Sequence, residues 1–410
     1  MIVKQRWVRK KRWCLLVSSF LMLIVMFFCI FLNDFVMAGW FHYPFPEKCV
    51  LSTATNLLND QCNNFTKGFA FGLLCEALCL SKKITIKTCI HHGNTYVFMA
   101  KHNGNNIIIK KKKPRDVRYL YNYFTDFIRV NQNTSSVEKT FFKIILEEIQ
   151  SSFGTVSSKL LASDFDFFLN TLFGKISLSL KEMQSAILSI AQSELVMFAL
   201  HRNLKSFPKI LGTCGEFYAV DSFQTYSEIY PRLLKDMSWL KRAKIASSFL
   251  NLIQDFQNSQ VGLLSHCDIQ ENNFGLTRYL NVKAIDVDLV FSKDKIEEIL
   301  TQPSCQSDYE CNFFDCQSEC DTKNGRCTTK SVTNNLQVLC RDILYPKWPF
   351  VGLLSSKIPI KIRTQLKQIL THCRSESFGK FSNTHLQAFN LFLRHFFAVR
   401  PLPIFLLVLY

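Results

Sequence analysis

The sequence predicts an α+β fold of two lobes, preceded by a single transmembrane helix. Two runs rich in β-forming residues between residues 95 and 110 flank an Asn-Gly-Asn turn, which is typical of a β-hairpin. Apolar residues at helical spacing predict helices over 181–203 and 237–258, with two short strands between them, within 207–221. About 370 residues follow the transmembrane segment, which is long for one simple core. We therefore expect a small N-lobe that contains the hairpin and a mainly helical C-lobe.

The first 36 residues are typical of a membrane anchor. Residues 1–12 carry six basic residues and no acidic residue, and the twenty residues from Trp13 to Leu32 carry no charge. That length spans a bilayer as a helix, and the basic flank predicts a cytosolic N-terminus. A cleavable signal peptide is the alternative, but the apolar stretch is long for one and only a weak cleavage site follows. We expect 1–12 to be a cytosolic tail, 13–36 a single-pass type II signal anchor, and the remainder to be luminal.

Cysteine usage agrees with a luminal location. Of the sixteen cysteines, two lie in the predicted anchor and fourteen follow it. In an oxidising compartment this even number predicts a disulfide framework, and sequons at Asn64 and Asn133 add support for passage through the secretory pathway. The cysteines from Cys305 to Cys340 form a zinc site in the alternative interpretation. No CxxC pair at ligand spacing occurs among them, so we favour disulfides.

The net charge of +17 does not by itself indicate a nucleic-acid partner. Six of the positive charges lie in the predicted cytosolic tail. The rest of the chain has no basic motif interleaved with aromatic residues, and a luminal location argues against nucleic acid. We expect instead a surface that attracts acidic partners or phosphate.

Three short motifs have the spacing of a phosphoryl-transfer site. They are His266-Cys267-Asp268, then Asn273, then Asp286-Val287-Asp288. An acid at the start of a catalytic loop, an amide five residues later and a second acid eighteen residues after the first form the C-lobe arrangement of a protein kinase. There the first acid orients the attacking hydroxyl, and the other two groups hold metal ions on the nucleotide phosphates. The alternative is two unrelated hydrophobic turns with polar residues, which we disfavour because several independent placements agree.

The order of predicted elements, the anchor and the cysteine pattern resemble one family. Together with the phrase Ala-Ile-Asp-Val-Asp-Leu-Val over 284–290, they are similar to the cysteine-rich type II membrane members of the divergent protein kinase-domain family of the endoplasmic reticulum. The resemblance covers nearly the whole chain and implies a protein-kinase-like fold with disulfide-rich insertions. We accordingly expect a cysteine-rich segment over 37–94, an N-lobe over 95–221 with a helical insertion at 111–180, and a C-lobe over 222–410 with a cysteine-rich insertion at 303–340.

The resemblance implies a lysine and a glutamate that act as a pair. The strand Ile107-Ile108-Ile109-Lys110 takes the place of the kinase strand whose lysine reaches the α- and β-phosphates, and Lys112, on the same face, is the fallback. Glu194, on the helix before the next strand, takes the place of the acid that pairs with this lysine. The alternatives are a solvated charge run before Pro114 and an ordinary surface glutamate.

The resemblance also implies roles for the three motif positions. Asp268 takes the position of the catalytic base, Asn273 that of the metal-binding amide and Asp286 that of the metal-binding acid. The implied cofactor is ATP with Mg²⁺ or Mn²⁺. His266 fits the structural histidine of this loop, which supports the backbone rather than transferring protons.

Several features depart from an ordinary kinase. Only Gly93 and Gly104 occur between Cys89 and Lys110, so the phosphate-covering glycine loop is altered or missing. Cys267 replaces the usual arginine, Asp288 stands where glycine is usual, and cysteines fill the region of the activation segment. These cysteines suggest a fixed loop rather than a switchable one.

The family often carries an EF-hand-like insertion before the glutamate-bearing helix. Here the corresponding loop keeps its glycine, Gly174, but its first, third, fifth and twelfth positions are Leu169, Thr171, Phe173 and Leu180. A loop without carboxylates at these positions is not expected to hold calcium.

These observations predict a membrane-anchored luminal kinase. It would transfer the γ-phosphoryl group of ATP to a hydroxyl of a secretory-pathway protein or glycan. The alternative is a pseudokinase that serves as a binding or scaffold protein of the endoplasmic reticulum lumen. The missing glycine loop favours the pseudokinase, whereas retention of the lysine, both acids and the amide favours the enzyme, which we prefer.

Overall fold

The computed structural model describes residues 49–113, 117–131, 133–347 and 350–375. The chain divides into two compact units, Met1–Cys49 and Val50–Tyr410, and the second contains every element given below. The predicted cytosolic tail and signal anchor lie outside the described residues. Within the described residues no single helix has the length and apolar character to cross a membrane, although one bent helix pair, Leu180–Ile190 with Ser193–Leu200, passes by length and composition.

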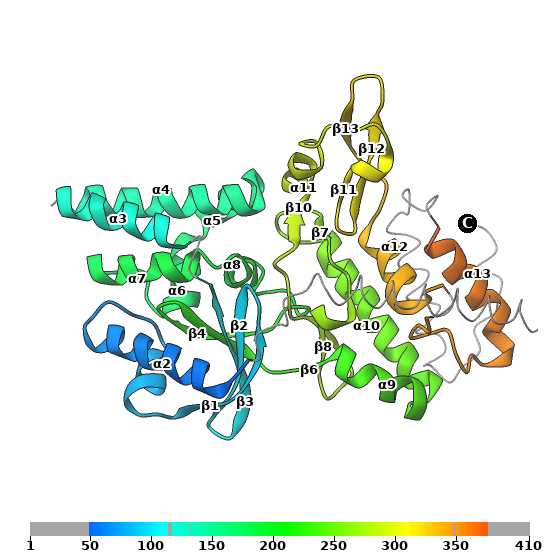
Figure 1. The fold of residues 1–410 in the computed structure, drawn as a ribbon, viewed down its shortest axis with the longest axis horizontal. Coiled ribbons are helices and arrows are strands. Elements are labelled where there is room, and N and C mark those ends of the chain that lie inside the picture. Colours follow the sequence, from blue (N-terminus) through cyan, green and yellow to red (C-terminus); the bar gives the residue numbers. More distant parts are fainter. Residues whose placement is uncertain (1–48, 114–116, 132, 348–349, 376–410) are drawn as a thin grey trace, which may run out of the picture. The chain divides into compact units, whose positions relative to one another are not determined.

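A five-stranded antiparallel sheet forms the centre of the N-lobe, which we define as residues 50–221 (Figure 1). The strand order is β1-β2-β3-β5-β4. The expected hairpin is confirmed as β2 and β3, and β1 precedes it within the segment that the sequence assigned to the cysteine-rich region. The strands are β1 (Ile84–His92), β2 (Thr95–His102), β3 (Asn105–Lys112), β4 (Ile210–Cys214) and β5 (Phe217–Asp221).

Alternation along the strands explains which face of this sheet is buried. Phe98 and Ala100 on β2 and Ile107 and Ile109 on β3 share one apolar cluster, while their neighbours in sequence are more exposed. The same cluster includes Phe217 on β5. Because Lys110 directly follows Ile109, this alternation directs it to the opposite face.

Seven α-helices and one π-helical turn, Glu76–Leu80, of the described residues belong to the N-lobe. α2 contacts β1, and α6 and α8 contact β4. Leu169 and Phe173, at the first and fifth positions of the EF-hand-like loop, are buried core residues of α6. The helices are α2 (Leu51–Thr66), α3 (Val117–Val130), α4 (Thr134–Phe153), α5 (Thr155–Ser163), α6 (Phe165–Phe173), α7 (Leu180–Ile190) and α8 (Ser193–Leu200).

The single helix expected over 181–203 is wrong, because α7 and α8 meet at an angle of 98°. Gln192, at the break, has extended backbone angles. Its side chain accepts a hydrogen bond from the backbone N–H of Lys112 (3.1 Å) and donates one to the carbonyl of Glu216 (2.8 Å). These long-range bonds fix the break, and the break turns α8 toward the sheet.

The C-lobe, residues 222–375, is mainly helical. The helix expected over 237–258 is confirmed as α10, which has 19 residues, most of them buried, and contributes apolar side chains to the largest core cluster. The helices are α9 (Tyr226–Asp236), α10 (Trp239–Gln257), α11 (Lys293–Leu300), α12 (Asn335–Leu339) and α13 (Arg363–Cys373).

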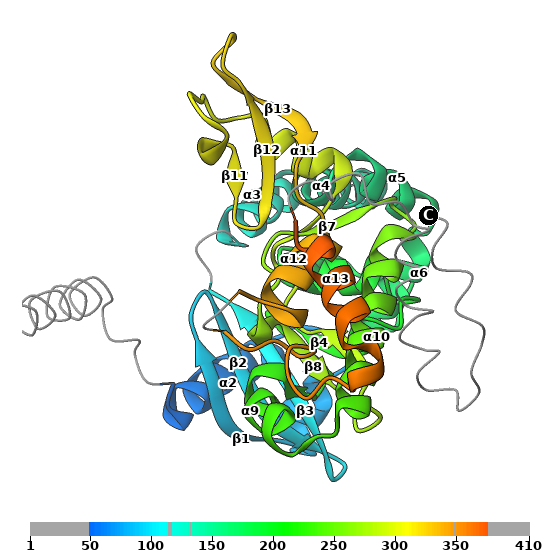
Figure 2. The same ribbon diagram turned by 90° about the vertical axis from the view of Figure 1, so that its right-hand side faces the viewer.

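Three small antiparallel sheets complete the C-lobe. One has the order β6-β8-β9, the second pairs β7 with β10, and the third has the order β11-β12-β13 and lies against α11 (Figure 2). The strands are β6 (Gln224–Thr225), β7 (Leu264–His266), β8 (Phe274–Leu276), β9 (Val282–Ala284), β10 (Val290–Ser292), β11 (Asn312–Phe313), β12 (Cys316–Asp321) and β13 (Arg326–Ser331).

All fourteen cysteines from Cys49 onward are in disulfides, which confirms the expected framework. The sulfur atoms of Cys305, Cys311 and Cys320 lie within 4.8 Å of one another, but all three belong to disulfides and offer no thiolate to zinc. The zinc alternative is therefore wrong for this state of the chain. The pairs include Cys62–Cys79, Cys75–Cys214, Cys267–Cys316, Cys305–Cys320, Cys311–Cys327 and Cys340–Cys373.

Candidate active site

Lys110 and Glu194 form a buried ion pair between β3 and α8. The Lys110 Nζ lies 2.6 Å from the Glu194 Oε1, and the residues are 8% and 4% exposed. The hydroxyl of Tyr218 on β5 donates to the other carboxylate oxygen of Glu194 at 2.6 Å. The alternatives of a solvated charge run and a surface glutamate would require both residues to be solvated, and neither residue is.

The other lysines of the run have different partners. Lys111 is also buried, forms an ion pair with Glu216 and lies over the ring of Phe217, at 5.3 Å from its centroid. The backbone N–H of Lys112 donates to Gln192. The charged side chain of Lys112 acts on the carboxylates of Glu148 and Asp288. Lys110 is therefore the lysine of this run that pairs with Glu194.

The Lys110 amine also contacts the segment that carries Asp286. Its Nζ donates to the backbone carbonyl of Ile285 at 2.8 Å. Burial on its own would lower the pKa of Lys110, but the carboxylates of Glu194, Asp286 and Asp288 outweigh burial and raise it. The lysine is thus protonated at physiological pH, and its amine contacts the residue that directly precedes the predicted metal-binding acid, Asp286.

Asp268 and Asn273 lie in direct contact in the catalytic loop. The Asn273 Nδ2 donates to the Asp268 Oδ2 at 2.7 Å and to the Asp268 carbonyl at 2.8 Å. The Asn273 carbonyl in turn accepts the N–H of Ile285 at 2.9 Å. Hydrogen bonds therefore connect the predicted base, the predicted amide ligand and the segment of Asp286.

The oxygen atoms around Asn273 and Asp286 suit a hard divalent cation. Both Asn273 N–H bonds go to Asp268, so the Asn273 Oδ1 is the side-chain atom left for a metal ion. Asp286 is exposed and supplies carboxylate oxygens. Amide and carboxylate oxygens are the ligands that Mg²⁺ and Mn²⁺ prefer. The residues present fit the predicted metal.

Three carboxylates in this site, those of Glu194, Asp286 and Asp288, lie near Lys110, and the charge of Lys112 also acts on Asp288. Burial raises the pKa of Glu194 to about 7, and the charges of Asp288 and Asp286 add to this rise against the opposing effect of Lys110. Burial, followed by the charge of Asp286, also raises the pKa of Asp288. Neighbouring carboxylates that raise one another's pKa form an electrostatic setting in which a divalent cation binds favourably.

His266 supports the loop backbone. Its ring lies near those of Phe256 and Phe274, with centroids 6.2 and 5.6 Å away, and its Nδ1 accepts the N–H of Asp268 at 3.3 Å. Burial lowers the pKa of His266 to about 4, so the ring is neutral at physiological pH. This arrangement orients the loop and supplies no titrating group near neutral pH.

Two family models match the chain. One, described as the protein-kinase domain of FAM69, matches residues 186–376. The other, described as the N-terminal cysteine-rich ER region of FAM69, matches residues 7–163. The chain belongs to the FAM69 family. The resemblance to a cysteine-rich divergent kinase-domain family is therefore confirmed, and the chain is a kinase-like protein. The N-terminal match contains Lys110, and the kinase-domain match contains the other four predicted site residues.

An apolar patch that sequence reasoning missed adjoins the site of this FAM69 chain. A Cβ atom added to Gly275 on β8 would lie 2.7 Å from the Cβ of Phe223 and 3.0 Å from the Cγ2 of Ile285. Because Ile285 also accepts the hydrogen bond from Lys110, the patch lies directly beside the predicted phosphate-binding lysine. Its only signal in the sequence is a glycine two residues after Asn273.

One small recess lies beside Glu194 in this structure. The recess, lined by Lys112, Glu194, Tyr218, Asp288 and their neighbours, measures about 10 Å³, which is room for one water molecule. Ligand pockets usually measure about 300–1,000 Å³. This recess is therefore too small for a nucleotide, and Lys110, Asp268, Asn273 and Asp286 are not among its lining residues.

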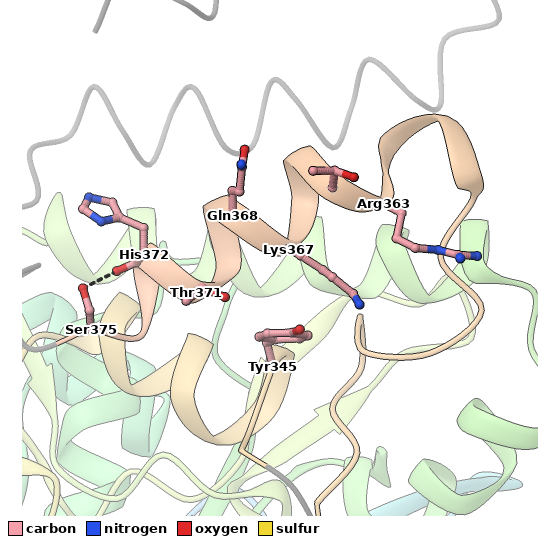
Figure 3. A pocket seen from close by; sticks show the side chains of 8 residues that line it. Tyr345, Arg363, Lys367, Gln368, Thr371, His372 and Ser375 are labelled. Carbon is pink, nitrogen blue, oxygen red and sulfur yellow. Dashed lines mark hydrogen bonds between the residues drawn. The ribbon is translucent and has the colours of Figure 1, made fainter.

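A larger groove lies on α13 and contains none of the predicted site residues (Figure 3). It measures about 630 Å³, and Tyr345 forms part of its floor, with Lys367 pointing toward the ring. Gln368 points away from the groove floor. The groove does not enlarge the candidate active site.

Proposed function

We propose that this chain is a membrane-anchored kinase of the endoplasmic reticulum lumen that transfers the γ-phosphoryl group of ATP, with Mg²⁺ or Mn²⁺, to a hydroxyl of a protein or glycan. One observation carries the proposal. The buried Lys110–Glu194 pair contacts Ile285, next to Asp286, while Asn273 holds Asp268 and the same Ile285 segment. Charge neutralisation and positioning are the main tasks in phosphoryl transfer, and these residues supply both.

Each residue has a defined task in this mechanism. Lys110, held by Glu194 and Tyr218, neutralises charge on the nucleotide phosphates. Asn273 and Asp286 would hold the metal ion, which supplies further charge neutralisation on the phosphates. The oxygen of the acceptor hydroxyl bonds to the γ-phosphorus, and Asp268 accepts the proton that this hydroxyl loses. The bond from phosphorus to the β–γ bridging oxygen breaks, and ADP leaves.

A second candidate function is nucleotide binding without transfer, as in a pseudokinase scaffold. The small recess beside Glu194 and the reduced turn between β1 and β2, where Gly93 is the only glycine, favour it. The intact contact between Asn273 and Asp268 favours the enzyme, because a scaffold has no need to orient a base.

Transfer of labelled phosphate tests the proposal. The full-length chain in detergent is incubated with γ-labelled ATP, Mn²⁺ and dephosphorylated luminal proteins. We expect labelled protein or glycan with the wild type and a loss of about 100-fold or more with Asp268→Asn. Asp126→Asn, an exposed acid paired with Arg129, is the matched control and should retain full activity. Equal labelling with Asp268→Asn and wild type would reject the enzyme, and binding of ATP without any labelled product would favour the scaffold.

A further inference from the structure

The turn between β11 and β12 holds the catalytic loop on both sides of Asp268. The backbone N–H of Asp315 donates to the carbonyl of Cys267 at 2.8 Å. Its carboxylate oxygen Oδ2 accepts the N–H of Ile269, also at 2.8 Å. Asp315 therefore bonds to the residue before Asp268 and to the residue after it.

Two further interactions fix this turn in place. The disulfide Cys267–Cys316 joins the loop to β12 directly beside Asp315, and both cysteines are buried in a small apolar cluster that includes Ile296 on α11. The Arg341 Nη2 lies 2.6 Å from the other carboxylate oxygen of Asp315. We call Asp315, Arg341 and the disulfide Cys267–Cys316 the loop clamp.

Phe314, just before Asp315, has a backbone conformation that its surroundings must hold in place. Its φ of +54° lies in the left-handed region, which costs a residue with a large side chain about 1–3 kcal/mol. Its side chain is 62% exposed, so burial of this ring does not offset that cost. The bonds of Asp315, including the one that its carbonyl accepts from the Thr333 hydroxyl (2.8 Å), and the disulfide help to hold the turn in this conformation.

Three further backbone groups before Asp268 also have partners distant in the sequence. Asn335 at the start of α12 accepts the N–H of His266 (2.9 Å) and donates to the carbonyl of Leu264 (2.7 Å). The N–H of Cys267 donates to the carbonyl of Leu289 (2.8 Å). With Asp315 on Cys267 and Ile269, the backbone on either side of Asp268 is held by groups distant in the sequence.

We propose that Asp315 is a positioning residue for Asp268 and that the loop clamp keeps the catalytic loop permanently in one conformation. In switchable kinases an arginine beside the catalytic acid binds a phosphate on the activation loop. Here Cys267 occupies that position and is bonded covalently to the corresponding region. The loop clamp therefore orders the catalytic loop without phosphorylation. The consequence for transfer rests on the proposed function, whereas the effect on the loop backbone does not.

Hydrogen exchange and turnover on the full-length chain test the clamp. Asp315→Ala removes the acceptor for Ile269. Asp315→Asn keeps an oxygen for Ile269 but loses both the charge and the acceptor oxygen toward Arg341. Glu319→Gln on β12 is the control, since it disrupts only an exposed ion pair with Lys330. We expect faster amide exchange over residues 264–273 in Asp315→Ala, an intermediate effect in Asp315→Asn and none in Glu319→Gln. With water as acceptor, ATP hydrolysis should fall about 100-fold in kcat for Asp315→Ala, with KM for ATP nearly unchanged.

The outcomes separate the clamp from the proposed function. Exchange over 264–273 that stays at the wild-type rate in Asp315→Ala overturns the clamp, as does a fall in kcat/KM that comes from KM alone. If the wild type binds and hydrolyses no ATP, the proposed function fails. In that case faster exchange in Asp315→Ala than in Glu319→Gln still supports the clamp, and equal exchange still overturns it.

Discussion

Among single residues, Glu194 lies where burial, a lysine and two further acids act on one carboxylate. It is bonded by Lys110 and Tyr218 and is near two further acids, Asp286 and Asp288. Its pKa of about 7 lies above the ordinary value of 4.5. Between these two pH values the folded chain therefore binds a proton that the unfolded chain has lost. The contribution of Glu194 to folding stability therefore falls as pH rises through this range. A bound cation would reverse this effect by favouring the carboxylate.

The first prediction concerns pH. Binding of Mn²⁺–ATP should release a proton below about pH 7 and strengthen as pH rises from about 6 to about 8. The measurement is the rise in Tm caused by Mn²⁺–ATP at the two pH values. His266 and His201, whose pKa values lie at about 4, do not titrate in this window. The dependence should flatten in Glu194→Gln, and a larger rise at the lower pH would contradict the assignment.

The second prediction concerns the close approach at Gly275. Gly275→Ala places a methyl group against the Cβ of Phe223, so overpacking should lower the free energy of unfolding by about 1–3 kcal/mol. Urea unfolding measures it. In a Phe223→Gly background the same substitution should cost clearly less, because the nearest atom has been removed. An equal cost in both backgrounds would show that another contact limits this position.

Among the elements, the break between α7 and α8 positions Glu194. Gln192 is 3% exposed, and its two side-chain hydrogen bonds link this break to β3 and to the turn before β5. Because Glu194 follows two residues later, the same bonds set where α8 begins relative to Lys110. Sequence periodicity suggested one straight helix, since glutamine is a good helix former and its partners are 80 and 24 residues away.

The third prediction tests this break. Gln192→Ala leaves the N–H of Lys112 and the carbonyl of Glu216 without their side-chain partner, at a cost of about 0.5–1.5 kcal/mol for each of these part-buried hydrogen bonds. Gln368→Ala on the exposed face of α13 is the control and should change the free energy of unfolding by less than about 0.5 kcal/mol. If the two variants unfold at the same urea concentration, Gln192 does not stabilise the break.

For the whole molecule, the sequence predicted what depends on local pattern and short spacing. The hairpin of β2 and β3, helix α10 and the proximity of Asp268 to Asn273 are local features of this kind. The resemblance supplied one contact between distant residues, Lys110 with Glu194, 84 residues apart. Other distant contacts were missed: the bonds of Asp315 to Cys267 and Ile269, the approach of Phe223 to Gly275 and the disulfide partners. An even cysteine count predicts a framework, but it leaves many pairings open.

The fourth prediction concerns the topology of the whole chain. If residues 13–36 are a type II anchor, Asn64 and Asn133, both exposed, should carry glycans in cells. Glycosidase treatment should then lower the apparent mass, and the double variant Asn64→Gln/Asn133→Gln should show no such change. A chain that glycosidase leaves unchanged and that protease digests in intact microsomes would contradict the luminal location.

The central claim is that Lys110, Asn273 and Asp286 converge on one metal–nucleotide site. The most direct test is the rise in Tm of the full-length chain on addition of ATP with Mn²⁺. We expect a rise with wild type and with the control Asp126→Asn, and none with Asp286→Asn, because binding stabilises the folded state by mass action. The absence of a rise at millimolar ATP, or an equal rise in wild type and Asp286→Asn, would contradict the claim.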